Sequence, residues 1–149
     1  MSASNKIGAV YKEGDECKYP RMITIVSKHN CVRLMINEIE LIEQEGRMLH
    51  IVTADKDYCI CESMKSIAPI LNPKNFYRPL SALIVNFDHV KEIDGQFINF
   101  ESGQSASMGK NNISKTKTAF RKYLRECAPY GYYVGGIKVA EPAANQKTE

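Results

Sequence analysis

Basic, amide and hydroxyl side chains gather at three polar corners of the chain, at residues 44–47, 78–81 and 109–112. An arginine guanidinium offers a planar fork of donors that matches guanine O6 and N7, and both lysine and arginine bind phosphate. Asparagine and serine can hydrogen-bond phosphates or base edges. These residue types therefore indicate a surface that recognises nucleic acid.

The first corner reads Gln-Glu-Gly-Arg, where Gly46 allows a sharp turn and Arg47 presents its fork to a guanine. The alternative is an exposed Arg47 that is only loosely paired with Glu43 or Glu45. In the second corner, Arg78 can grip a phosphate. Ser81 can hydrogen-bond a base, although its short hydroxyl discriminates poorly between bases. Alternatively, it only helps to form the turn.

The third corner follows Gly109 and contains Lys110, Asn111 and Asn112. Lys110 lacks a planar fork and is suited to a looser purine contact. Asn111 and Asn112 can bond phosphate or read adenine, and one of them can equally cap a helix; we expect Asn112 to do so. Lys115, in the helix that follows, is a candidate phosphate contact. The alternative is that Lys115 simply belongs to the solvent-exposed side of a charged helix.

The charge pattern agrees with one basic face. The chain carries a net charge of +3, and between residues 102 and 125 there are six basic residues and no acidic one, whereas residues 37–62 hold seven acids. A polyanion needs only one positive surface on its partner, so local clustering matters more than the total. We therefore expect Arg47, Ser81 and Lys110 on a common electropositive side.

The composition is that of a soluble globular domain. The chain has 149 residues, of which 44% are hydrophobic and 25% charged, and no apolar run approaches the roughly 20 residues that cross a bilayer. Without a signal peptide the expected location is the cytoplasm. No metal pair, phosphate loop or nucleophile motif is present, so we expect no enzyme, metal or cofactor. The five cysteines are expected to be reduced, with Cys59 and Cys61 buried.

Short runs of β-branched and aromatic residues predict a mainly β fold. The runs are residues 21–26, 31–36, 39–42, 48–53, 58–61, 83–85, 89–93 and 96–100. Turn residues separate them, and the last three runs are typical of a β-meander. Residues 63–71, with Ser63 as N-cap, and residues 113–124 have helical spacing. We predict stacked antiparallel sheets of about ten short strands with two short helices.

The run from Phe76 to Lys110 resembles the C-terminal half of the LytTR family of DNA-binding domains from bacterial transcriptional regulators. The positions that carry the resemblance are Phe76, Arg78, Val85-Asn86, Val90 to Ile93, Gly103 and Lys110. Residues 39–43 look like the family strand that ends in Glu before a groove-contacting loop. Three positions depart from the pattern: Leu80 replaces a His, Ala82 a Ser, and Lys110 an Arg.

The resemblance implies a LytTR-like domain at residues 21–125, between a flexible N-terminal arm (1–20) and a partly disordered C-terminal extension (126–149). It implies a response regulator-like, sequence-specific transcriptional regulator that reads the major groove through loops. Its implied partners are double-stranded DNA with promoter repeats, a second copy as a homodimer on DNA, and a regulatory membrane protein. It also puts Arg47, Ser81 and Lys110 at base-contacting positions.

The alternative function is a protein-interaction module without DNA affinity. Such a module would dock a partner through an exposed sheet edge or through the Tyr-rich segment at residues 130–134.

Overall fold

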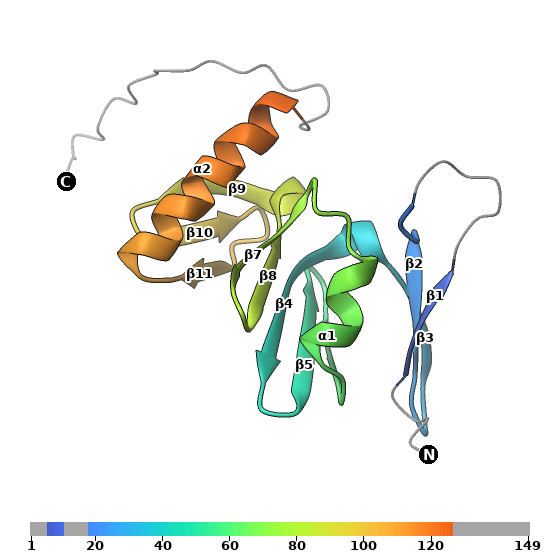
Figure 1. Cartoon of the computed structure of the whole chain (residues 1–149). Coiled ribbons are helices and arrows are strands. Elements are labelled where there is room, and N and C mark those ends of the chain that lie inside the picture. The colour runs from blue at the N-terminus through green and yellow to red at the C-terminus, as the bar shows by residue number, and fades with distance from the viewer. Residues whose placement is uncertain (1–5, 11–17, 127–149) are drawn as a thin grey trace.

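A computed structural model describes the backbone of residues 6–10 and all of residues 18–126. In these residues eleven strands form antiparallel sheets of three, five and three strands, joined by two α-helices and three short 3-10 helices. Figure 1 shows the sheets in series, with the five-stranded sheet in the middle. This mainly β architecture confirms the predicted fold class.

The N-terminal sheet has the order β1-β2-β3, with β1 at Lys6–Val10, β2 at Met22–Val26 and β3 at Cys31–Met35. The predicted hairpin of β2 and β3 is confirmed: Val26 pairs with Cys31, and the Ser27 N–H donates to the Asn30 carbonyl at 2.8 Å. β1 lies inside the expected N-terminal arm. The sequence pattern did not predict this strand, because its pairing to the β2 edge is a long-range interaction.

The central sheet has the order β6-β5-β4-β8-β7. Its strands are β4 (Ile39–Glu45), β5 (Met48–Thr53), β6 (Asp57–Ile60), β7 (Phe76–Leu80) and β8 (Leu83–Asn86). One face packs with the N-terminal sheet and with α1 (Met64–Ile67) and the 3-10 helix η2 (Ala68–Ile70) around a shared apolar core. Ser63 occupies the predicted N-cap position of α1, but its side chain makes no capping bond.

The third sheet contains β9 (Val90–Asp94), β10 (Phe97–Phe100) and β11 (Ser105–Ser107), and the helix α2 (Lys110–Glu126) follows it. Ile113, Thr116, Phe120 and Tyr123 are the buried residues of α2. Their spacing of three and four residues forms one helix face, which packs on the second apolar core.

Phe87 anchors α2 to the core. Its ring centroid lies 5.1 Å from that of Phe120 and 5.5 Å from those of Tyr77 and Tyr123. Phe87 is 4% exposed, and the Tyr123 hydroxyl donates a hydrogen bond to Asp88. Because aromatic pairs at these separations attract each other, this cluster fixes the helix on the sheets.

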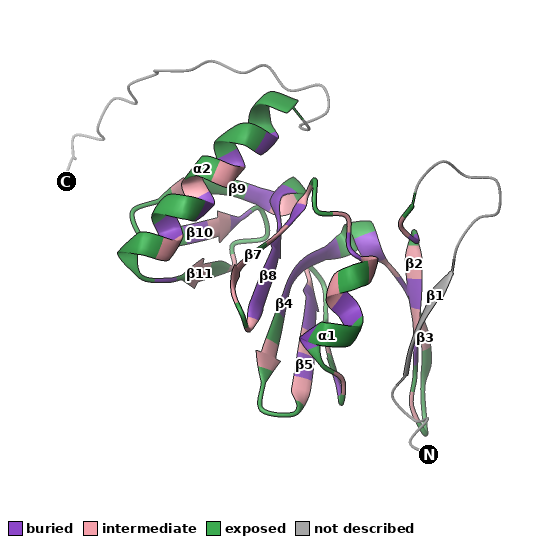
Figure 2. Cartoon of the chain, viewed as in Figure 1, coloured by how far each residue is buried: buried purple, intermediate pink, exposed green. Residues whose placement is uncertain are grey.

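The predicted β-meander is wrong in one respect. β8 pairs with β4 and β7, whereas β9 and β10 form a different sheet with β11. The 3-10 helix η3 (Phe87–His89) redirects the chain between them, and the Asn86 side chain caps it by accepting from the Asp88 N–H at 3.0 Å. Figure 2 shows β8 buried along its length, as expected of an inner strand with core on both faces.

The predicted burial of Cys59 and Cys61 is also wrong. Both are exposed, because Cys59 lies on β6, the edge strand of the central sheet, and Cys61 directly follows that strand; Cys31, at the start of β3, is exposed as well, and Cys17 and Cys127 lie outside the described residues. Leu124, near the end of α2, is 37% exposed. The Tyr-rich segment at 130–134 and the expected C-terminal extension beyond residue 126 also lie outside the described part of the chain.

Candidate nucleic-acid interface

The first two polar corners lie side by side at one end of the central sheet. The β4–β5 turn is Gly46-Arg47, between the paired residues Glu45 and Met48, and Gly46 has a φ of 62°. The β7–β8 turn follows Leu80, which pairs with Leu83. The Gln44 N–H donates to the Ala82 carbonyl at 2.9 Å. Because this bond joins one corner to the other, Arg47 and Ser81 lie on neighbouring turns, and both are exposed.

The side chain of Gln44 holds the first corner in shape. Its Nε2 donates to the carbonyls of Gly46 and Glu62, each at 3.1 Å, and of Met48 at 3.3 Å. Its Oε1 accepts from the Met64 N–H at 2.9 Å. Gln44 thus ties the Arg47 turn to the start of α1. Local sequence patterns do not reveal this positioning role of Gln44, because two of its partners lie 18 and 20 residues away.

Arg78 stabilises the second corner. Its Nε and Nη2 donate to the Ser81 carbonyl at 3.1 and 2.6 Å, so the guanidinium closes the turn from one side. An arginine carries five N–H donors, which leaves donors for a phosphate. The β7–β8 pairing shifts register between Tyr77 and Leu80, where Pro79 has no N–H to give to the ladder.

The third corner joins β11 to α2. Lys110 and Asn111 are the exposed first residues of the helix, and Asn112 is half-buried. The predicted Asn112 cap is wrong: the helix begins at Lys110, and the Gly109 carbonyl accepts from the Ile113 N–H at 2.9 Å. Asn112 instead accepts at its carbonyl from the Thr116 hydroxyl at 2.7 Å. Lys115 is exposed one turn further along.

A groove of about 430 Å³ lies between the first two corners and β11; Glu45 of the first corner lines it, whereas none of residues 109–112 of the third corner does. Leu80 and Ala82 line it from the second corner, and β11 lines it from the other side through residues 105–107. In Figure 1 the β4–β5 tip and the β7–β8 turn both point downward, while α2 starts at the left, next to β11. The structure therefore brings the first two corners together and places β11, which leads into the third, across the groove from them.

The electrostatics of the groove differ from the expected electropositive side. Its walls include Glu43, Glu45 and Asp57 but no lysine or arginine. Glu45 lies 3.2 Å from His50 Nε2. Within residues 18–126 Arg47 forms no ion pair with Glu43 or Glu45, so the guanidinium remains available to a ligand.

A buried carboxylate fixes the third sheet against the central one. Glu40 is 1% exposed, and its Oε1 accepts from Ser102 Oγ at 2.9 Å and from Gln104 Nε2 at 3.0 Å. Gln104 also lines the groove. Since Glu40 belongs to β4 and both donors belong to the β10–β11 loop, these bonds set the position of β11 relative to the first corner.

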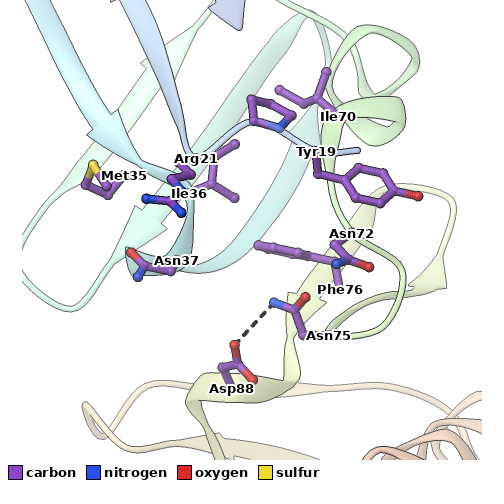
Figure 3. Close-up of a pocket in the computed structure, with 11 residues that line it drawn as sticks. Tyr19, Arg21, Met35, Ile36, Asn37, Ile70, Asn72, Asn75, Phe76 and Asp88 are labelled. Carbon is purple, nitrogen blue, oxygen red and sulfur yellow. Dashed lines mark hydrogen bonds between the residues drawn. The ribbon is translucent and has the colours of Figure 1, made fainter. Parts of the chain in front are cut away.

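A second cavity of about 380 Å³ lies where the N-terminal sheet meets β7 and η3. Figure 3 shows Phe76 at its centre, with Arg21 and Asn37 on one wall and Asn72 and Asn75 on the other. Asn75 Nδ2 donates to Asn86 Oδ1 at 3.0 Å and to Asp88 at 3.4 Å. The hydrogen bonds of Asn75 therefore join parts of the fold to each other.

No group of three or more His, Cys, Asp or Glu side chains is arranged to hold a metal ion in residues 18–126. Of the helices in the described residues, none has the length and apolar character needed to cross a membrane.

Comparison with known proteins agrees with the geometry. The model of the LytTr DNA-binding domain family matches residues 29–121. Among solved structures, the fold is similar to the LytTr DNA-binding domain of a putative methyl-accepting/DNA response regulator from Bacillus cereus, with 14% identity, a TM-score of 0.58, and coverage of 66% of this chain and 95% of that one. No curated protein matches the chain. The chain belongs to the LytTR family of DNA-binding domains.

Proposed function

We propose that the protein is a sequence-specific transcriptional regulator that reads the major groove of double-stranded DNA through loops of a rigid β scaffold. The observation that carries the proposal is the arrangement of the corners: the Gln44 to Ala82 hydrogen bond couples the first two, and β11, which leads into the third, lines the opposite side of the groove that Glu45 and Leu80 line. Rigidly held neighbouring loops can enter a groove together, which mobile loops cannot do without a large entropy cost.

Each exposed residue has a proposed role that follows from its chemistry. Arg47 reads guanine through its fork, and Ser81 contacts a base or the sugar next to it. Lys110 and Asn111 approach a purine. These three corners contain the base-reading side chains that we propose.

Phosphate contacts lie at the margins of the same surface. Arg78 keeps donors beyond those given to Ser81, and Lys115 is exposed on α2. Asn112 is half-buried in the first turn of α2, where its backbone can contribute to a phosphate site at the helix N-terminus. Because Glu43, Glu45 and Asp57 repel phosphates from the groove, the DNA backbone is expected to follow the basic rims.

The proposed partners are promoter DNA with repeated sites, a second copy of the chain bound to the neighbouring repeat, and a regulatory membrane protein, all of which the family resemblance suggests. The domain that binds DNA comprises residues 21–125 in this proposal, and it works in the cytoplasm.

Fluorescence anisotropy with a labelled duplex tests the proposal. A site selected from a random pool serves as specific DNA, and a scrambled duplex serves as non-specific DNA. Arg47→Ala should lower the ratio of specific to non-specific affinity by about 5- to 150-fold, since a bidentate contact contributes about 1–3 kcal/mol of discrimination. Lys115→Ala should weaken both duplexes alike and reduce the slope of log K against log salt by about one.

Lys74→Ala is the matched control, because Lys74 is exposed just before β7, at the strand end remote from Ser81. Its removal should leave affinity and salt slope nearly unchanged. Equal binding of wild-type protein to selected and scrambled duplexes would refute sequence-specific recognition. Binding of a protein partner with no DNA affinity would instead establish the interaction module.

A further inference from the structure

Phe97 is the most exposed large hydrophobic residue among those described, with 52% of its surface accessible. It is the first residue of β10, whose pattern alternates strictly: Ile98 and Phe100 are buried in the second core, and Phe97 and Asn99 point to the other face. Its exposure is therefore set by strand register, and a one-residue shift would be needed to bury it.

The surroundings of Phe97 are polar. Its cross-strand partners are Asp94 on β9 and Ser107 on β11, and the next row on the same face contains Glu92, Asn99 and Ser105. A stable protein interface needs about 800 Å² per partner with an apolar centre. A single aromatic ring among these polar neighbours does not supply such a centre, so Phe97 is suited to one small apolar group.

Phe97 also lies beside β11, the strand that forms one side of the groove. Directly paired residues in a sheet project to the same face, so its ring lies beside the Ser107 side chain. Ser107 lines the groove, and the Met108 N–H that follows donates to the Gln96 carbonyl at 3.2 Å. Lys110 comes three residues after Ser107. Phe97 is thus close to the segment that leads into the third corner.

We propose that Phe97 contacts the C5-methyl group of a thymine in the recognised DNA, and so adds an A·T preference next to the bases read by the third corner. This inference rests on the proposed DNA-binding function and deepens it. In the major groove thymine is distinguished by its methyl group, which an aromatic side chain can cover. Covering it removes apolar surface from water without adding charge. The polar side chains around Phe97 do not offer this contact.

Replacing thymine by deoxyuridine tests the proposal, because the change deletes only the methyl group. Affinity of the full chain is measured for the selected duplex and for duplexes with deoxyuridine at each thymine in turn. Wild-type protein should lose about fourfold in affinity at one or two positions, the effect of burying one methyl group. Phe97→Ala should weaken the parent duplex by a similar factor and become insensitive to deoxyuridine at those positions.

Leu124→Ala, which removes an exposed apolar side chain near the end of α2, is the control and should keep the full deoxyuridine effect. Wild-type binding that is specific but unaffected by every deoxyuridine overturns the thymine contact and leaves the proposed function standing. The contact is also overturned if Phe97→Ala retains the wild-type sensitivity. If the wild-type protein shows no preference for the selected duplex, the proposed function itself is refuted.

Discussion

Replacing Gln44 by glutamate tests whether the first corner depends on a single side-chain amide. Gln44 is half-buried, and its Nε2 lies 3.1–3.3 Å from three carbonyl oxygens, while Oε1 accepts from the Met64 N–H. The amide has two N–H groups, so it contributes about three net hydrogen bonds, each of about 1 kcal/mol. With partial rehydration of the carbonyls, we expect Gln44→Ala to lower the free energy of unfolding by about 2 kcal/mol.

Gln44→Glu should lower the free energy of unfolding more than Gln44→Ala does at neutral pH. The carboxylate keeps the Met64 bond but faces three carbonyl oxygens that it cannot donate to, so the expected loss is about 3–4 kcal/mol. A carboxyl in this position favours its protonated form, which raises its pKa in the folded state. The folded variant then binds more protons than the unfolded one, so the penalty is largest above the raised pKa and shrinks as the pH falls.

Urea denaturation at about pH 7 and about pH 5 measures the difference. Gln96→Glu is the control, because it makes the same change at an exposed residue of the β9–β10 turn and should have an effect within about 0.5 kcal/mol. The reasoning is refuted if Gln44→Glu is as stable as the wild type at neutral pH, or if its penalty grows on acidification after correction by the control. If Gln44 positions Arg47, Gln44→Ala should also reduce the preference for the selected DNA.

Three further substitutions test other parts of the structure by the same denaturation assay. Phe87→Ala should lower the free energy of unfolding by about 3–5 kcal/mol, because Phe87 is 4% exposed and touches three rings; a loss below about 1 kcal/mol would show that α2 is anchored elsewhere. Asn86→Leu should lower the free energy of unfolding by about 3 kcal/mol, because the fully buried amide accepts from Asn75 and Asp88 and donates to the Ile39 carbonyl at 2.8 Å. An unchanged free energy of unfolding would contradict this network. Gly46→Ala should lower the free energy of unfolding by about 1–2 kcal/mol, because Gly46 has a φ of 62°. Gly46→Asn should lower it less, since asparagine tolerates that conformation. A larger loss for asparagine than for alanine would rule out backbone strain as the cause.

Several features of the fold could be predicted from local residue patterns. The β2–β3 hairpin follows from two β-rich runs around a polar turn, and the β4–β5 turn follows from Gly46, whose backbone adopts the left-handed conformation. Pro69 lies in the first turn of η2, directly after α1, and limits α1 to a short helix. These signals act within a few residues, so the sequence alone contains them.

Other features depended on contacts between distant segments. Runs 83–85 and 89–93 looked like consecutive strands of one meander, but Asn86 caps η3 and bonds the Ile39 carbonyl, which separates β8 from β9. The predicted cap at Asn112 was wrong for a similar reason. Met108 is buried in the second core, and the helix begins two residues later, at Lys110. Tertiary packing decided both boundaries over local preference.

The candidate site divides in the same way. The residue types of Arg47, Ser81 and Lys110, and the turns that expose them, were evident in the sequence, as was the resemblance to the LytTR family. Only the tertiary structure joined the first two corners, through the Gln44 to Ala82 bond, and positioned β11 across the groove from them, through the Glu40 bonds that span 62 and 64 residues. It also placed acidic side chains along the groove, and it placed Phe97 next to Ser107 of β11. Local propensity determines which turns form, whereas the relative placement of turns depends on long-range pairing and burial.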